Sequence, residues 1–341
     1  MEILEYHLEE TLKLPKNLEL LLNSSNFAIF DIETTGLSPR FNNVILIGLL
    51  YIKNNHIVIE QFFCNNRKEE IQLLTSFKEK IQQFDLLIDY NGNAFDIPFL
   101  NKRFLLNSID YSIGSYKSID LLKLIRKVQK NLSIANCKLK SIEQYLGIHR
   151  SDQISGKDSV LLYDQFEEQQ SKHLKDIILL HNYDDLYYLS KSLIILDSIR
   201  YEKILQCFPQ VLHIAGGTIC YITKQFIKNG SFHLEGFYQN KDIADYIFYE
   251  NSFDFQYTQK SNTFSIKIPL YKGSLSTGSK CLYIDTHDFP FHYDHKHSKL
   301  SIPENIILFK ENQDIKIEEI YSFVSILIIH IFRKMKKNTF L

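Results

Sequence analysis

The stretch that decides the fold is residues 27–36, which read FAIFDIETTG. Its first six residues form a short apolar run, which favours a buried β-strand. Because successive strand residues point to opposite faces, Asp31 and Glu33 project to the same side at the end of this strand. Paired carboxylates repel each other unless a cation lies between them, so the stretch predicts a site for a hard divalent metal ion. Solvated turn-forming acids before a Thr-Thr-Gly turn are the alternative.

The segments that follow this stretch alternate between strand and helix patterns. Two strand-like runs, one helical pattern and one further strand-like run come next, at residues 44–52, 56–63, 68–84 and 86–90. From about residue 94 to residue 199 the spacing of apolar residues is mostly helical. This order predicts an α/β domain with a mixed sheet and flanking helices. Beyond these four strand-like runs we expect one more strand, which gives a mixed five-stranded sheet.

Two further groups of polar residues lie at a distance along the chain. Asp96 ends the sequence NGNAFD, directly after the fourth strand-like run, at a helix start where the helix dipole also favours an acid. His181 and Asp185 lie in the helical sequence HNYDD, and their spacing of four residues puts them on one helix face. Asp184 lies off this face and is a reserve ligand. Each group alone is also compatible with an ordinary solvated turn or helix surface.

The three groups, in this order and at these separations, resemble the three exonuclease motifs of the DEDD superfamily. The stretch from Asp120-Leu121-Leu122 to Leu146-Gly147-Ile148 looks like the YprB-type ribonuclease H-like branch, and the resemblance covers roughly residues 25–200. It implies an enzyme, a metal-dependent 3'-5' exonuclease that hydrolyses phosphodiester bonds at single-stranded DNA or RNA ends. The sequence does not indicate which of the two nucleic acids is cut.

The resemblance also implies roles for individual residues. Four acids are implied as metal ligands: Asp31, Glu33, Asp96 and Asp185. They would hold two divalent cations, Mg²⁺ or Mn²⁺, because ligand sets made only of oxygen favour these ions over zinc. The predicted catalytic groups are His181, Glu33 and Asp185. Substrate contacts are predicted for Thr35, Leu37, Asn91 and Phe95, with Leu37 as a wedge near the last bases.

The sequence departs from the family pattern at His181. The two best-known subclasses have a tyrosine with three intervening residues, or a histidine with four, before the last aspartate. Here three residues separate His181 from Asp185. An imidazole at this spacing can still orient or deprotonate a water. The departure supports the alternative of a catalytically weak or inactive nucleic-acid-binding or scaffold protein, whereas the presence of all four acids favours the enzyme.

The length and charge of the chain limit how it can be organised. Its 341 residues are enough for two domains. We expect a lead-in segment at residues 1–26, a ribonuclease H-like exonuclease domain at 27–200 and an accessory region of unknown role at 201–341. Short runs of Phe, Tyr and Ile predict that the accessory region is rich in β-strands and ends in a helix. A net charge of −1 indicates that any basic surface for nucleic acid is local.

Both ends of the chain bear on its location. Residues 1–26 lack a basic region followed by an apolar stretch, so we expect no signal peptide and a cytoplasmic protein. Residues 320–332 form a largely apolar stretch of 13 residues, where a bilayer span needs roughly 20. We expect a buried helix there, with an interfacial membrane anchor as the alternative. The predicted partners are single-stranded nucleic-acid 3' ends, and no protein partner is indicated.

Overall fold

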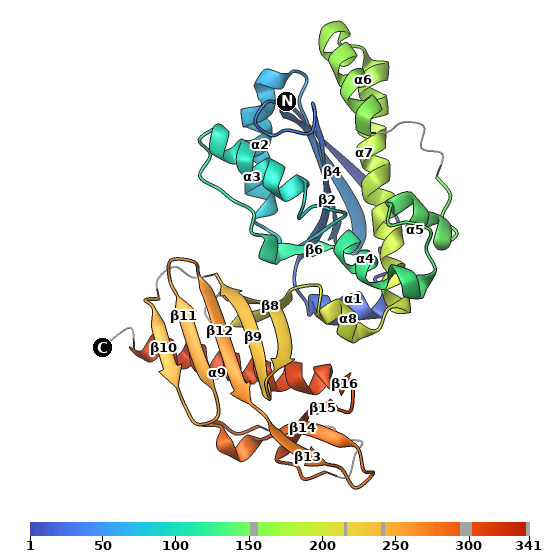
Figure 1. Cartoon of the computed structure of the whole chain (residues 1–341). Coiled ribbons are helices and arrows are strands. Elements are labelled where there is room, and N and C mark those ends of the chain that lie inside the picture. The colour runs from blue at the N-terminus through green and yellow to red at the C-terminus, as the bar shows by residue number, and fades with distance from the viewer. Residues whose placement is uncertain (151–155, 215–216, 240–242, 294–301, 339–341) are drawn as a thin grey trace. The chain divides into compact units, whose positions relative to one another are not determined.

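The structure is a computed structural model that describes residues 1–150, 156–214, 217–239, 243–293 and 302–338 (Figure 1). The chain divides into two compact units, Met1–Phe208 and Pro209–Leu341. Buried apolar side chains form a core within each unit. Each unit is therefore built around its own apolar interior.

The first unit is built on a six-stranded mixed sheet of order β1-β4-β3-β2-β5-β6. Strands β1 to β4 pair antiparallel, whereas β5 and β6 continue the sheet from β2 in the parallel direction. The predicted mixed α/β sheet is thus confirmed, with six strands where five were expected. The strands are β1 Glu2–Leu8, β2 Phe27–Thr34, β3 Val44–Lys53, β4 His56–Phe63, β5 Leu86–Asp89 and β6 Ser118–Asp120.

Strand β1 is the strand that the sequence did not predict. It lies in the expected lead-in segment and pairs antiparallel with β4, from Glu2 opposite Phe63 to Leu8 opposite Ile57. As an edge strand it is half-exposed or exposed along its whole length, and it carries two glutamates. The alternation of apolar and polar residues that marks a strand is weak in such a segment.

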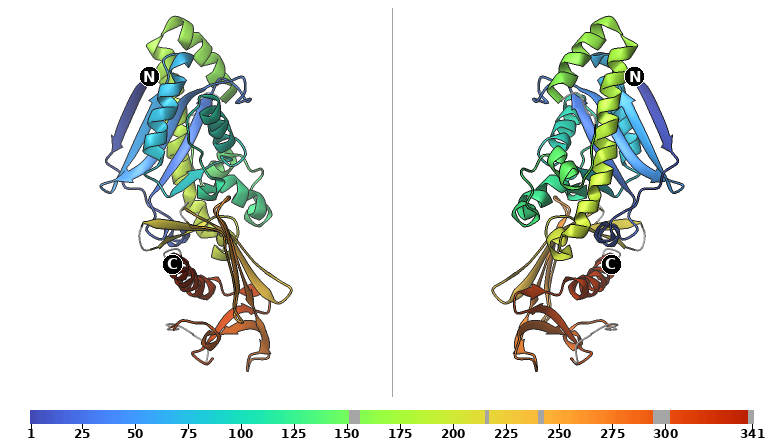
Figure 2. Two further views of the ribbon diagram at one scale, coloured as in Figure 1. Left: turned by 90° about the vertical axis from the view of Figure 1, so that its left-hand side faces the viewer. Right: turned by 90° about the vertical axis from the view of Figure 1, so that its right-hand side faces the viewer.

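Helices cover both faces of this sheet (Figure 2). Phe77 of α2 and Leu100 of α3 belong to the apolar cluster on one face. Tyr163 of α6 and Ile178 of α7 belong to the cluster on the other. The helices of the unit are α1 Lys16–Leu22, α2 Glu70–Ile81, α3 Asp96–Leu106, α4 Leu121–Leu132, α5 Leu139–Tyr145, α6 Gly156–Gln169, α7 Lys172–Ser192 and α8 Tyr201–Leu205.

Strand β2 separates its apolar and acidic side chains between these two faces. Ala28, Phe30 and Ile32 pack into the cluster that contains α2 and α3. Since side chains alternate along a strand, Asp31 and Glu33 point to the face covered by α7. The period of two that buries the apolar residues therefore also presents the two acids to the α7 side of the sheet.

The second unit is rich in β-strands and ends in a helix, as predicted. Its six-stranded antiparallel sheet has the order β10-β11-β12-β9-β8-β7, and a four-stranded sheet has the order β13-β14-β15-β16. The strands are β7 Gln210–Ile214, β8 Thr218–Lys228, β9 Ser231–Tyr238, β10 Tyr246–Tyr249, β11 Asp254–Thr258, β12 Thr263–Pro269, β13 Tyr271–Ser274, β14 Lys280–Asp285, β15 Ile306–Glu311 and β16 Asp314–Ile315.

Helix α9, Ile317–Asn338, contains the apolar segment at residues 320–332. Ile320, Phe323 and Leu327 are fully buried in the core of the second unit. The expected buried C-terminal helix is thus confirmed. None of the helices in the described part of the chain is long and apolar enough to cross a membrane.

Candidate active site

A glycine lets α7 approach the sheet where Asp31 projects. Gly48 of β3 is the register partner of Asp31. A Cβ atom at Gly48 would lie 2.1 Å from Oδ1 of Asn182 and 2.6 Å from Cδ1 of Leu186, both on α7. A side chain at this position would therefore collide with Asn182 and Leu186 and displace them. The close approach brings one turn of α7 next to the acids of β2.

Asn182 connects the sheet to Asp31 through side-chain hydrogen bonds. Gln61 of β4 donates from Nε2 to Oδ1 of Asn182 at 2.9 Å. Asn182 in turn donates from Nδ2 to Oδ2 of Asp31 at 3.0 Å. Both amides are fully buried, so their donors and acceptors have fixed orientations. This chain of hydrogen bonds orients the Asp31 carboxylate, and the sequence alone did not single out either amide.

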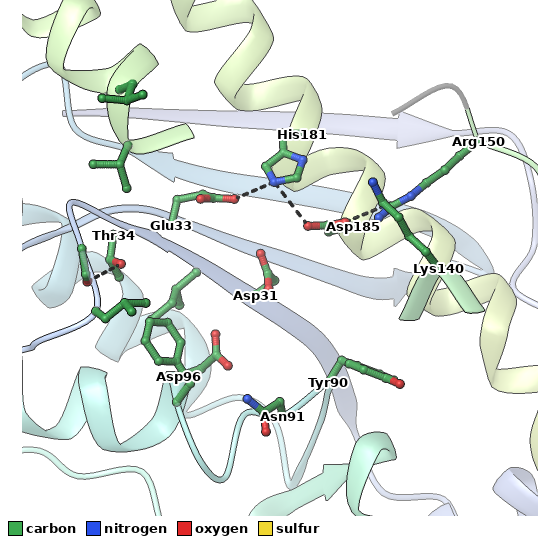
Figure 3. Close-up of a pocket in the computed structure, with 16 residues that line it drawn as sticks. Asp31, Glu33, Thr34, Tyr90, Asn91, Asp96, Lys140, Arg150, His181 and Asp185 are labelled. Atoms are coloured by element: carbon green, nitrogen blue, oxygen red, sulfur yellow. Dashed lines mark hydrogen bonds and ion pairs between the residues drawn. The ribbon is translucent and has the colours of Figure 1, made fainter. Parts of the chain in front are cut away.

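The predicted metal ligands line one cavity of about 810 Å³ (Figure 3). Asp31 and Glu33 come from β2, Asp96 from the start of α3 and Asp185 from α7. Residues from the same segments complete the predicted set that lines the cavity: Leu37, Asn91, Phe95 and His181. The structure therefore brings together residues separated by up to 154 positions in the sequence, from Asp31 to Asp185.

Thr35 is the predicted site residue that does not line the cavity. Its hydroxyl accepts a hydrogen bond from the backbone N–H of Asn43 at 3.0 Å and lies 3.4 Å from Oδ1 of Asn42. Thr34 lines the cavity instead, with its hydroxyl donating to the carbonyl of Gly36 at 2.9 Å. Thr35 thus holds the turn that leads to Leu37.

Glu33, His181 and Asp185 form the tightest cluster of possible ligands. Nε2 of His181 lies 3.6 Å from Oε1 of Glu33 and 3.7 Å from Oδ2 of Asp185. One ligand atom from each of the three residues can be chosen so that all lie within 4.8 Å of one another. The predicted spacing of four residues on one helix face therefore places the imidazole between the two carboxylates.

Asp96 is positioned by a loop that two other buried acids hold. Asp89, at the end of β5, accepts from the backbone N–H of Gly92 at 2.7 Å. Asp120, at the end of β6, accepts from the backbone N–H of Asn91 at 3.0 Å. A Cβ atom at Gly92 would lie 2.4 Å from Cγ of Asp89, so the loop requires a glycine there.

Burial is the main influence on the pKa values of three acids of the cavity, Asp31, Glu33 and Asp96. It raises the pKa of Asp31 well above its ordinary value, and the charges of Asp185, Asp96 and Glu33 raise it further, whereas the hydrogen bond from Asn182 lowers it. Burial likewise raises the pKa of Glu33 and of Asp96 to about 7. Buried oxygen donors that repel one another are the ligand set that hard divalent cations prefer. The residues present therefore fit Mg²⁺ or Mn²⁺.

Two basic side chains also line the cavity, and neither was predicted as part of the site. They are Lys140 of α5 and Arg150, which follows α5. Arg150 Nη1 lies 2.5 Å from Oδ1 of Asp185, and its Nε lies 3.2 Å from Oε2 of Glu143. Arg150 and Asp185 are 35 residues apart, so no local pattern in the sequence signals their contact.

The family match lies within the first unit. A family model described as RNase_H superfamily matches residues 28–194. The chain is 29% identical over 201 residues to a PolC-type DNA polymerase III of Ureaplasma parvum, across 49% of this chain and 14% of that protein. It is 26% identical over 196 residues to the 3'-5' exonuclease DinG of Staphylococcus aureus, across 50% of this chain and 21% of that protein. A solved structure of exonuclease I is similar at 14% identity and a TM-score of 0.37, across 62% of this chain and 55% of that chain.

The matches cover only a small part of the length of each curated relative. The chain spans about a seventh of the length of the polymerase and about a fifth of the length of the DinG protein. The family match is at the level of the superfamily. The narrower YprB-type branch therefore stays a prediction.

Proposed function

Residues 28–194 are a ribonuclease H-superfamily domain, and from this premise we propose that the chain is a metal-dependent 3'-5' exonuclease acting on single-stranded DNA or RNA ends. The observation that carries the proposal is that four acids from β2, α3 and α7 line one cavity. Similarity to the 3'-5' exonuclease DinG of Staphylococcus aureus supports it. The proposed catalytic part is residues 27–200, with residues 201–341 as an accessory region.

The proposed ligands of two divalent cations, Mg²⁺ or Mn²⁺, are the four acids of the cavity: Asp31, Glu33, Asp96 and Asp185. When bound, such ions polarise a phosphodiester and make a water more acidic. The raised pKa values of Asp31, Glu33 and Asp96 support the proposal, because buried acids that resist ionisation gain most from a neighbouring cation. The buried amide of Asn182 would keep the carboxylate of Asp31 in a fixed orientation.

His181 is the proposed proton acceptor. Its Nε2 faces both Glu33 and Asp185, so a water held by either carboxylate is within reach of the imidazole. Glu33 and Asp185 would orient that water and stabilise the positive charge on the imidazole after proton transfer. The geometry supports this role although the histidine occupies the spacing that a tyrosine has in one subclass.

The proposed contacts to the terminal nucleotide come from the loops beside the acids. Leu37 is 84% exposed and lines the cavity, which suits an apolar side chain that stacks against a base or wedges beside it. Phe95 and Asn91 line the same cavity from the loop before α3. Thr35 is proposed to act through the turn that holds Leu37 in position.

The test is an assay with single-stranded DNA and RNA that carry a label at either the 5' or the 3' end. We expect mononucleotides to be released from the 3' end with Mg²⁺ or Mn²⁺, and no hydrolysis with a chelator. Asp31→Ala should abolish hydrolysis while the circular dichroism spectrum stays unchanged. Full activity in this variant would remove Asp31 from the site. Binding of either nucleic acid without hydrolysis in any metal would favour the alternative of an inactive binding protein.

A further inference from the structure

Arg150 is a buried cation in a cavity of acids. Its side chain is only 7% exposed and contacts Asp185 and Glu143. Its guanidinium also lies 5.7 Å from the ring centre of Tyr188. Figure 3 shows the side chain extending to Asp185 from the side opposite His181. Both carboxylate oxygens of Asp185 thus face basic groups, Oδ1 the guanidinium and Oδ2 the imidazole.

The two acidic partners of Arg150 differ in their access to solvent. The side chain of Glu143, on α5, is 3% exposed, whereas that of Asp185 is 23% exposed and lines the cavity. A guanidinium that is buried needs a fixed partner, because an isolated buried charge is strongly unfavourable. Glu143 suits this anchoring role, and Asp185 is the partner that other groups entering the cavity can reach.

We propose that Arg150 is an internal counterion that competes with divalent cations for Asp185 and makes their binding depend on a phosphate. The inference rests on the proposed function, since it concerns the same cavity. A guanidinium repels a metal ion that shares its carboxylate, so it weakens metal binding in the absence of substrate. A guanidinium also binds phosphate through paired hydrogen bonds. A phosphate in the cavity therefore gives Arg150 another anionic partner and strengthens metal binding, and by linkage the metal strengthens phosphate binding.

The charged residues that line the cavity support competition between Arg150 and a divalent cation for Asp185. The four acids carry one negative charge each when ionised, and the basic residues lining the cavity are Lys140, Arg150 and His181. Arg150 is in direct contact with a proposed metal ligand through a fully charged group. Removal of this charge should therefore strengthen metal binding while it weakens the response to phosphate.

The experiment measures the affinity of the full chain for Mn²⁺ by titration calorimetry, with and without thymidine 5'-monophosphate. Arg150→Met alone leaves Glu143 buried without this guanidinium, which can destabilise the fold. The main variant is therefore Arg150→Met combined with Glu143→Gln, which removes both charges together. Without nucleotide we expect this variant to bind Mn²⁺ about tenfold more tightly than the wild-type protein, the order expected for loss of a nearby unit charge. The gain in Mn²⁺ affinity on adding nucleotide should be smaller in the variant.

Two control variants are needed. One separates the charge of Arg150 from its shape, and the other separates an effect at this site from the general effect of removing an arginine. Arg150→Lys keeps the charge, so its Mn²⁺ affinity should stay near that of the wild-type protein. Arg200→Met removes an arginine that is 66% exposed, pairs with Glu202 at 3.3 Å and does not line the cavity. It should leave Mn²⁺ binding unchanged. Thermal unfolding of each variant checks that the fold is retained.

Each outcome decides the inference independently of the proposed function. If the double variant binds Mn²⁺ no more tightly than the wild-type protein, Arg150 does not compete for Asp185, whether or not the wild-type protein hydrolyses nucleic acid. If the wild-type protein hydrolyses nothing but the double variant binds Mn²⁺ more tightly, the exonuclease proposal fails and the counterion role of Arg150 stands. Equal gains from nucleotide in both proteins would overturn the link to phosphate.

Discussion

Two groups of buried acids lie at the same end of the first sheet, and they differ in what surrounds their oxygens. Asp89 and Asp120 accept hydrogen bonds from backbone N–H groups, and Asp89 also accepts from the hydroxyl of Ser118 at 2.6 Å. Glu33 and Asp96 are about as deeply buried but line a cavity in which other acids face them. The difference teaches that burial of an acid does not by itself mark a site. Glu33 and Asp96 also accept hydrogen bonds, from Ser159 and from backbone N–H groups. What matters is whether the carboxyl lines the cavity, where a cation can reach it.

The two groups of acids therefore have different roles at the candidate site. Asp89 and Asp120 fix the loop that leads into α3, so they set the position of Asp96 without lining the cavity. Asp96 and Glu33 face the cavity, where a cation can relieve the repulsion among the acids. Four predictions test this contrast.

The largest expected effect comes from the matched pair Asp96→Asn and Asp89→Asn, on either side of the same loop. Asp96→Asn removes a proposed metal ligand, so hydrolysis should fall by about 10³-fold or more. Burial, followed by the charge of Asp120, raises the pKa of Asp89 well above its ordinary value. A neutral amide is therefore a close substitute for Asp89, and Asp89→Asn should keep metal-dependent hydrolysis within about tenfold of the wild-type rate.

The measurement is the rate of nucleotide release under saturating Mg²⁺, normalised to the folded fraction. Circular dichroism provides the control for folding of both variants. If Asp89→Asn lost as much activity as Asp96→Asn, the distinction between acids that support the loop and acids that bind metal would be wrong.

The second prediction concerns the pH dependence of stability without metal. Burial raises the pKa of Glu33 from 4.5 to about 7, so the folded protein binds this proton more tightly than the unfolded chain does. The stabilisation is fully present below the unfolded value and is lost as the pH rises to about 7. Free energies of unfolding from urea titration should therefore fall on the order of 3 kcal/mol between about pH 5 and pH 8 in the presence of a chelator.

Bound metal and a neutral substitution at Glu33 should each reduce this loss of unfolding free energy. At about pH 8, Mn²⁺ at a hundredfold excess over its dissociation constant should restore about 2.7 kcal/mol. Glu33→Gln should reduce the pH dependence by the contribution of this carboxyl, while Asp96, whose pKa is also raised to about 7, should keep part of it. A free energy of unfolding that stays constant over this range in the wild-type protein would show that Glu33 does not hold its proton unusually tightly.

Much of the fold and of the acid cluster could be predicted from sequence. The run of apolar residues before Asp31, the helical spacing of His181 and Asp185, and the position of Asp96 after a strand are local patterns. Each of them depends only on the period of two in strands or of about 3.6 in helices. Local patterns therefore placed each group on its strand or helix, and the resemblance to the DEDD exonuclease motifs was needed to select the four acids as one set.

The contacts that the sequence did not predict are those between distant elements. Gly48 had no visible role until α7 was seen to pack against it, and Arg150 meets Asp185 only through the packing of α5 beside α7. Asn182 lies next to His181 in sequence, but its amide acts across the sheet on Asp31. Edge strand β1 was missed because half of its pattern faces solvent. Such features depend on tertiary packing and leave no local period.

The third prediction tests the supporting acids through stability. Asp120 caps α4 by accepting from the backbone N–H of Lys123 at 3.3 Å, and it also accepts from Asn91. Asp120→Ala should therefore lower the free energy of unfolding by about 2 kcal/mol, from loss of the cap and of one buried hydrogen bond. Urea denaturation measures this change. Mn²⁺ affinity of the folded variant should stay within about threefold of the wild-type value, since the residue does not line the cavity.

The smallest expected effect comes from substitution of Asp184, which precedes Asp185 on α7. Asp185 lines the cavity and lies four residues after His181, whereas Asp184 lies one residue earlier and is not among the lining residues. Consecutive residues of a helix point about 100° apart, so these carboxylates cannot both face the same cavity wall. Asp184→Asn should therefore keep hydrolysis within about twofold of the wild-type rate, while Asp185→Asn should lose most of it. Comparable losses in both variants would mean that Asp184 shares the ligand role, and the assignment of one face of α7 to the metal would fail.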